Sequence, residues 1–247
     1  MMRTILLTLA LLCPAIVLAR QSVPAVVAST SWVGAFARAA GAMQVSVLAP
    51  PGLVHPPDYD PRPSDLLALS RASLVLVAGY EAFLPRLREA LGAKAQLLTV
   101  NTPHDPQVIR RESEAIAAVL GTQAKARAFA DAYDAAWLAS ATRLRQQTDR
   151  RKPVVLAQRF MVSWVRLLGV EPAATFGPGP LSLEELRRLK SLAPTLIIDN
   201  AHGAPASALA EVTGARRVVL VNFPQGSEGL LEVLQHNTER LQAALTP

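Results

Sequence analysis

The chain of 247 residues has a single cysteine, only 5% aromatic residues and four histidines. The cysteine, Cys13, lies in the apolar N-terminal segment. We therefore expect the rest of the chain to form neither a disulfide nor a zinc–thiolate site, which is compatible with an oxidising compartment. With few aromatic side chains and 51% hydrophobic residues, the core is expected to pack mainly through alanine and leucine.

Motifs of the common catalytic classes are also missing. The sequence has no P-loop, no glycine-rich dinucleotide fingerprint, no His-Glu-x-x-His and no Gly-x-Ser-x-Gly. The adjacent acids Glu184 and Glu185 open a helical segment, where they suit the helix dipole better than acid–base chemistry. We predict that the protein is not an enzyme and has no catalytic residues.

The formal net charge of +6 comes from basic residues that are scattered over helical segments, such as 141–145 and 186–190. No basic stripe alternates with aromatic residues, as a nucleic-acid surface would require. A solvated helix face is the better interpretation, and we expect no nucleic-acid partner.

The N-terminus has the pattern of a secretory signal. Arg3 precedes an apolar run that ends in Val17-Leu-Ala19, so residues 1–19 are predicted to be a cleaved signal peptide and the location periplasmic. The alternative is a membrane anchor, but the run contains a proline and is shorter than the roughly 20 residues that a span needs. The residues before Cys13 fit a lipoprotein signal poorly.

Short β-type runs alternate with helical patterns, which indicates a parallel α/β architecture. Between residues 107 and 147 this alternation stops, and only Gly121-Thr122 interrupts two helical patterns. The fold class is therefore two parallel-sheet α/β lobes joined by a single long helix, with a cleft between them.

The expected division is an N-terminal lobe 20–106, a helical connector 107–149 and a C-terminal lobe 150–247. The expected strands are Ala25–Ser29, Gln44–Leu48, Leu74–Ala78, Gln96–Val100, Val154–Ala157, Leu196–Asp199 and Val218–Val221. The expected helices are Trp32–Ala40, Ser64–Ser70 (with Ser64 as its N-cap), Ala82–Leu91, Gln107–Leu120, Gln123–Gln147, Phe160–Leu168, Ser182–Leu192, Ala206–Thr213 and Gly226–Ala244.

Two histidines lie just past predicted strands, about fifty residues apart. His55 follows the strand 44–48, and His104 follows the strand 96–100. Loops at strand ends are where α/β sheets bind ligands, and imidazole is a good ligand for first-row transition metals. Without a family context, turn histidines that hold no metal are the favoured interpretation of both.

The motifs around these histidines resemble the zinc/manganese-type solute-binding proteins of ABC transporters. The matching segments are Val47-Leu-Ala-Pro-Pro-Gly52, then His55, then Tyr59-Asp-Pro-Arg-Pro-Ser-Asp65, and more loosely His104-Asp-Pro106. The resemblance is detailed over about thirty residues and weaker over the rest of the chain after residue 19. It implies a periplasmic receptor, expected to be a monomer, that captures Zn2+ or Mn2+ as transported ligand for the membrane permease of an ABC importer.

The sequence departs from the family at two ligand positions. Gln158 stands where the family has a histidine at a strand end, and Asn222 stands where it has an aspartate. Amide oxygens are weak zinc ligands. Asp199 and His202, at the end of a neighbouring strand, are candidates to compensate. The expected metal ligands are His55, His104, His202, Gln158, Asp199 and Asn222.

Other assignments stay open at this stage. His236 is expected to be a helix-face residue, whereas Trp32 and Tyr59 either wall the cleft or simply pack. A receptor whose metal site has decayed, and which binds a siderophore- or cobalamin-type metal chelate, is an alternative. An aromatic-lined or Arg-lined cleft would support it, with Arg159 and Arg166 as contributors. A non-transport periplasmic protein on the same fold is a third reading.

Overall fold

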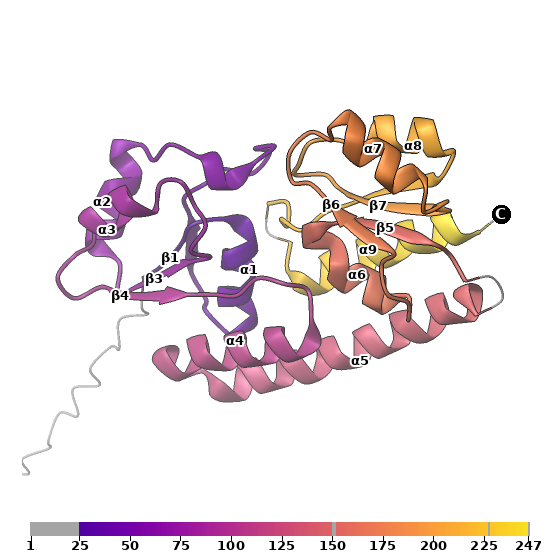
Figure 1. The fold of residues 1–247 in the computed structure, drawn as a ribbon. Coiled ribbons are helices and arrows are strands. Elements are labelled where there is room, and N and C mark those ends of the chain that lie inside the picture. The colour runs from indigo at the N-terminus through magenta and orange to yellow at the C-terminus, as the bar shows by residue number, and fades with distance from the viewer. Residues whose placement is uncertain (1–24, 150–151, 227, 247) are drawn as a thin grey trace, which may run out of the picture.

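The computed structural model describes residues 25–149, 152–226 and 228–246, in two α/β lobes that share one long helix (Figure 1). The predicted signal peptide, with Cys13, lies outside the described residues. Within the described ranges, no helix is both long and apolar enough to cross a membrane.

The N-terminal lobe contains a parallel four-stranded sheet in the order β2-β1-β3-β4. Each strand is followed by a segment that crosses back over a face of the sheet, as parallel pairing requires. Its elements are β1 (Val26–Ala28), α1 (Ser31–Ala39), β2 (Val45–Val47), the short 3-10 helix η1 (Pro56–Asp58), α2 (Pro63–Arg71), β3 (Leu74–Val77), α3 (Leu84–Glu89) and β4 (Gln96–Thr99).

The C-terminal lobe repeats this plan in the order β6-β5-β7-β8. Its strand β6 was not expected from the sequence, because it lies between Pro172 and the Gly-Pro-rich loop 177–180 and has a single β-branched residue, Thr175. The elements are β5 (Val155–Gln158), η2 (Arg159–Met161), α6 (Val162–Leu167), β6 (Ala174–Phe176), α7 (Leu183–Lys190), β7 (Leu196–Asn200), α8 (Ser207–Thr213), β8 (Arg216–Leu220) and α9 (Leu230–Leu245).

Two helices connect the lobes, and the second confirms the predicted long helix. Helix α4 (Pro106–Leu120) begins where the Asp105 side chain accepts hydrogen bonds from the Gln107 and Val108 amides. It ends at Gly121, whose φ of 71° is left-handed. Helix α5 (Gln123–Thr148) is 26 residues long and runs along the base of both lobes (Figure 1).

Strand alternation divides the apolar side chains between a shared core and two separate ones. In β3, Leu74 and Leu76 join a cluster that also contains Leu144 of α5 and Leu241 of α9. Val75 and Val77 point the other way, toward α2 and α3. Strand β7 divides in the same way, with Ile197 facing α7 and α8. The inner faces of both sheets therefore pack into one continuous core, so the lobes are joined by apolar contact as well as by α5.

Several helix starts differ from the sequence prediction by one or more residues, and two of these differences have a clear physical cause. Helix α2 begins at Pro63, so Ser64 lies inside the first turn and is not the N-cap. The fixed φ of proline suits the first helical position, and Asp65 accepts the Arg62 amide at 2.7 Å. Helix α9 begins at Leu230 rather than Gly226, because Gly226 has a φ of 55°, which a right-handed helix excludes.

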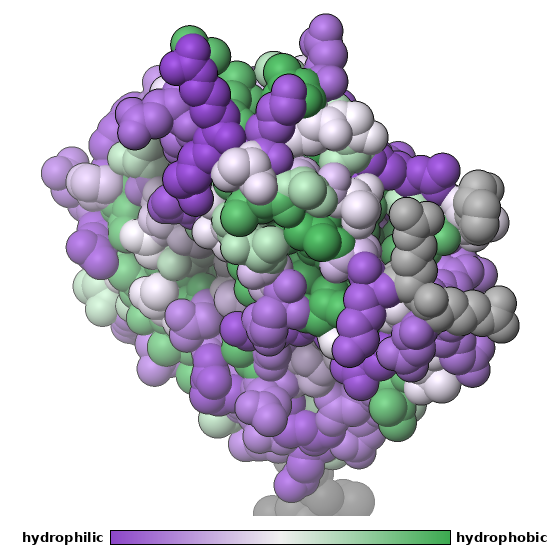
Figure 2. Space-filling view, turned by 45° about the vertical axis from the view of Figure 1, so that its right-hand side comes forward, coloured by the Kyte–Doolittle hydropathy of each residue, from purple (hydrophilic) through white to green (hydrophobic). Residues whose placement is uncertain are grey.

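The surface is mixed. Apolar side chains form small areas bordered by hydrophilic ones in the view of Figure 2. Arg187 and Arg188 of α7 are exposed, as expected for a solvated helix face.

Candidate metal site

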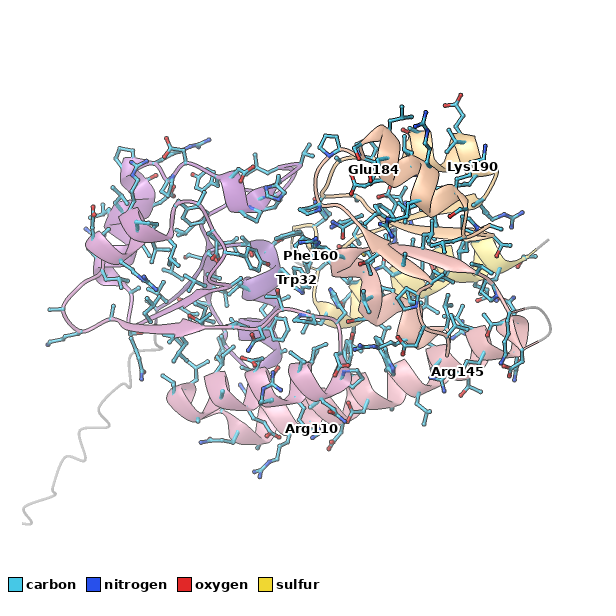
Figure 3. The ribbon with its side chains drawn as sticks, in the orientation of Figure 1. Trp32, Arg110, Arg145, Phe160, Glu184 and Lys190 are labelled. Carbon is cyan, nitrogen blue, oxygen red and sulfur yellow. The ribbon has the colours of Figure 1, made fainter. Side chains whose placement is uncertain are left out.

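The candidate ligands lie in loops that follow the strands, where the two lobes meet. We call this region the boundary between the lobes. Trp32 of α1 lies on its N-terminal side and Phe160, after β5, lies on its C-terminal side (Figure 3). Three hydrogen bonds cross it between described residues, and two of them come from candidate histidines. The third runs from Arg38 Nη2 to the Glu228 carbonyl at 3.0 Å.

His104 is buried inside this boundary, with 2% of its surface exposed. Its ring stacks on Trp32, with centroids 5.1 Å apart, and lies 4.9 Å from the ring of Trp164 in the other lobe. Its Nε2 lies 3.3 Å from the carbonyl oxygen of Asn222. Burial lowers the pKa of His104 to about 4, although the Asn222 carbonyl opposes the shift, so the ring is neutral at neutral pH.

His202 makes the reciprocal contact from the C-terminal lobe. Its Nδ1 lies 3.2 Å from the carbonyl oxygen of Val54, and its ring packs edge-on against Phe223 at 4.8 Å. Burial is the main cause of the lowered pKa of His202. The contact with the Val54 carbonyl raises this pKa in part, and the charge of His55 lowers it further. Because Val54 directly precedes His55, this contact places the loop of His202 against the loop that carries His55.

The two carbonyl contacts fix the tautomer of each buried ring. A neutral imidazole that faces a carbonyl must donate through that nitrogen, so the other nitrogen carries a lone pair. The remaining atoms, His104 Nδ1 and His202 Nε2, are buried and have no hydrogen-bond partner among the described residues. Metal-binding histidines are commonly held in this way, with the second ring nitrogen donating to a carbonyl or carboxylate.

His55 occupies the more open edge of the boundary. It precedes η1, and its side chain is 47% exposed. Its Nδ1 lies 2.9 Å from Asp58 Oδ2, so a neutral His55 would donate to this carboxylate and keep its Nε2 lone pair available.

The two amides at the family's ligand positions hold a turn. Gln158 Oε1 accepts the Phe160 amide at 2.7 Å, and Asn222 Nδ2 donates to the Phe160 carbonyl at 3.5 Å. Asn222 Oδ1 also accepts from Trp164 Nε1 at 3.5 Å. Each amide oxygen thus already has a donor, and Gln158 Nε2 is buried without a partner among the described residues.

Asp199 is engaged in structural contacts. It shares a strand face with Ile197, which packs toward α7 and α8. Its oxygens accept from the amides of Asn200 and Ala206 and from Arg217 Nε at 2.8 Å. These contacts leave Asp199 little capacity to ligate a metal.

The structure thus brings part of the candidate set together. The loops of His55 and His202 touch through the Val54 carbonyl, whereas the contacts that link His104 to His202 pass through Trp32 and Phe223. Across residues 25–149, 152–226 and 228–246, no three His, Cys, Asp or Glu side chains form a group that could hold a metal. As folded, the site presents separate donors rather than a complete coordination shell.

The other residues considered from the sequence lie as follows. Trp32 lies in the boundary, whereas Tyr59 donates to Asp65 at 2.7 Å and packs against Phe83 within the N-terminal lobe. His236 is exposed on α9. Arg159 and Arg166 are both exposed.

Sequence reasoning missed Trp164 and Phe223, which supply the C-terminal side of the ring stack. Trp164 lies six residues after Gln158, which the sequence analysis had already placed at a ligand position. In a chain with three tryptophans, that short distance from a candidate ligand was the available signal.

Comparisons with known proteins agree with this architecture. A family model described as "Zinc-uptake complex component A periplasmic" (ZnuA) matches residues 26–244. Among solved structures, the Cd-bound periplasmic metal binding protein of Candidatus Liberibacter asiaticus is 18% identical, with a TM-score of 0.67 over 90% of this chain and 100% of that one. The SBP FpvC of Pseudomonas aeruginosa with Mn2+ is 16% identical, with a TM-score of 0.73 over 91% and 97%. A Ni2+ complex of FpvC scores 0.71 at 16% identity, over 89% and 94%. No curated protein matches significantly.

Proposed function

The chain belongs to the family of periplasmic zinc-uptake components, and from this premise we propose that it captures a divalent transition metal between its lobes for the permease of an ABC importer. Zinc is the first choice, because imidazole suits it and manganese prefers more carboxylate. The N-terminal pattern supports export to the periplasm, and we infer that the receptor acts as a monomer.

One observation carries the proposal. His104 and His202 each contact a backbone carbonyl of the opposite lobe, which leaves one buried lone pair on each ring. A buried nitrogen without a partner costs about 1–3 kcal/mol, so a ligand for it is favoured over an empty position. Solvent-exposed surface histidines would carry no such cost.

His55 is the third imidazole and the accessible one. Its exposed position suits first contact with an arriving ion, and its neighbour His202 then supplies a second nitrogen. Gln158 and Asn222 line the same boundary, but their oxygens are weak ligands and already accept hydrogen bonds. We therefore expect weaker zinc binding than a four-ligand site provides.

Capture should involve a small movement of the lobes. The shared core contains side chains of both lobes around Leu144 of α5, so wide separation would expose apolar surface. A siderophore- or cobalamin-sized ligand is less well supported for the same reason, because Trp32, Trp164 and Phe223 are at most 6% exposed and fill the boundary.

Titration calorimetry on the metal-free protein with zinc and with manganese tests the proposal. His55→Ala should abolish zinc binding, whereas His236→Ala, on exposed helix α9, should leave it unchanged. Gln158→His should tighten zinc, because an imidazole replaces a neutral amide. Unchanged zinc affinity in both His55→Ala and Gln158→His would show that the boundary does not hold the metal.

A further inference from the structure

The unpartnered polar atoms of the boundary are of two opposite kinds. His104 Nδ1 and His202 Nε2 carry lone pairs, whereas Trp32 Nε1 and Gln158 Nε2 carry hydrogens. All four side chains are at most 7% exposed, and none of these atoms has a partner among the described residues. A ligand that satisfies this set must accept electron pairs at one point and hydrogen bonds at another.

A bare cation meets only half of that requirement. Zn2+ accepts lone pairs from imidazole, but it repels the positive ends of N–H dipoles. The amide of Gln158 instead favours an oxygen acceptor, and an anionic oxygen gives the stronger hydrogen bond.

The number of protein ligands leads to the same conclusion. Zinc commonly takes four ligands, yet no three His, Cys, Asp or Glu side chains gather within the described ranges. His55 and His202 lie on loops in direct contact, because His202 Nδ1 lies 3.2 Å from the carbonyl of Val54, the residue before His55. The remaining coordination positions would then have to be filled by water or by donors that come with the metal.

Two glycines leave space beside the Gln158 amide. A methyl group on Gly203 would lie 3.7 Å from Gln158 Nε2, and one on Gly177 would lie 3.5 Å from it. Because Gly203 directly follows His202, the amide donor lies beside the loop that carries the imidazole. Arg159, the next residue after Gln158, is exposed and adds positive charge to this edge.

We propose that the cargo is a divalent metal already held by a small carboxylate chelator, such as a hydroxy acid or an amino acid. His202 Nε2 and His55 bind the metal, and a carboxylate oxygen of the chelator accepts a hydrogen bond from Gln158 Nε2. The inference rests on the proposed function and specifies the form in which the metal enters.

Citrate added to a zinc titration tests this, because the two models predict opposite signs. If the protein binds only free Zn2+, citrate competes for the metal and weakens apparent binding. If it binds the chelate, zinc–citrate binds tighter than zinc alone, by about tenfold or more for one charged hydrogen bond. Native mass spectrometry of the complex should show zinc and citrate bound together, and zinc with L-histidine tests the amino-acid class.

Two variants test the amide itself. Gln158→Glu keeps the oxygen that accepts the Phe160 amide, but it replaces the N–H donor by a negative charge. It should weaken zinc–citrate and tighten free zinc, which reverses the wild-type preference. Gln146→Glu, on the exposed face of α5, changes the charge equally and should leave the preference intact. Gly203→Ala should weaken zinc–citrate alone, because the added methyl occupies the space beside the amide.

The outcomes distinguish binding of a metal chelate from capture of the free metal. Tighter zinc–citrate binding that Gln158→Glu reverses supports the inference. Free zinc binding at least as tightly as zinc–citrate, with no bound citrate in the mass spectrum, overturns the inference and leaves metal capture standing. Binding of neither zinc nor its citrate and histidine complexes overturns both.

Discussion

Acidification should destabilise the metal-free protein through His104. The ring is buried, and its pKa falls from 6.5 in the unfolded chain to about 4 in the folded protein. Between these values the unfolded state binds a proton that the folded state does not, so stability is complete above pH 6.5 and is lost as the pH falls toward 4.

The size of the effect follows from the two pKa values. Each pH unit below 6.5 favours the unfolded state by about 1.36 kcal/mol until the folded ring also titrates. At pH 5.0 the ring should therefore cost about 2 kcal/mol of unfolding free energy relative to pH 7.5. His202 adds to the loss in the same direction, because burial lowers its pKa too.

Urea denaturation of wild type and His104→Gln at pH 7.5 and pH 5.0 isolates the contribution. The variant lacks the ring stacking and the Asn222 contact at both pH values. The drop in unfolding free energy from pH 7.5 to pH 5.0, compared between wild type and variant, therefore reports the titration of His104 alone. Between pH 7.5 and pH 5.0, the unfolding free energy of the wild type should fall by about 2 kcal/mol more than that of the variant. Equal losses would refute the view of His104 as a neutral ring closed between Trp32 and Trp164.

The architecture was predictable because it depends on repeated patterns. Short β-type runs that alternate with helical patterns, interrupted once by a stretch of helical periodicity free of strands, predicted two lobes and the long helix that the structure shows as the 26-residue α5. Strand β6 was missed because its residues, 174–176, run directly into the Gly-Pro-rich loop 177–180, which the sequence indicates as a loop. The start of α9 was misplaced because a Gly-rich approach does not reveal a left-handed φ at Gly226.

The site was less predictable, because it depends on how the lobes meet. The sequence located His55, His104 and His202 after strands, which is a local property. It did not reveal that Trp164 would pack against His104 or that Phe223 would pack against Trp32, since those contacts join residues far apart in the chain. The role of Asp199 depends on Arg217 on the neighbouring strand, a pairing that one sequence does not show. Whether the six candidate ligands bind a metal together stays a prediction.

Two substitutions test these structural assignments. Ser182→Ala should cost about 1 kcal/mol of unfolding free energy, because Ser182 Oγ caps α7 through the Glu185 amide at 3.2 Å. Asp199→Ala should cost about 3 kcal/mol, because it leaves the 29% exposed Arg217 without its carboxylate and two backbone amides without an acceptor. If Asp199 is structural, zinc affinity measured by calorimetry below the melting temperature should equal that of wild type. A large loss of zinc affinity in a variant that remains folded would instead make Asp199 a metal ligand and require its side chain to leave Arg217 on binding.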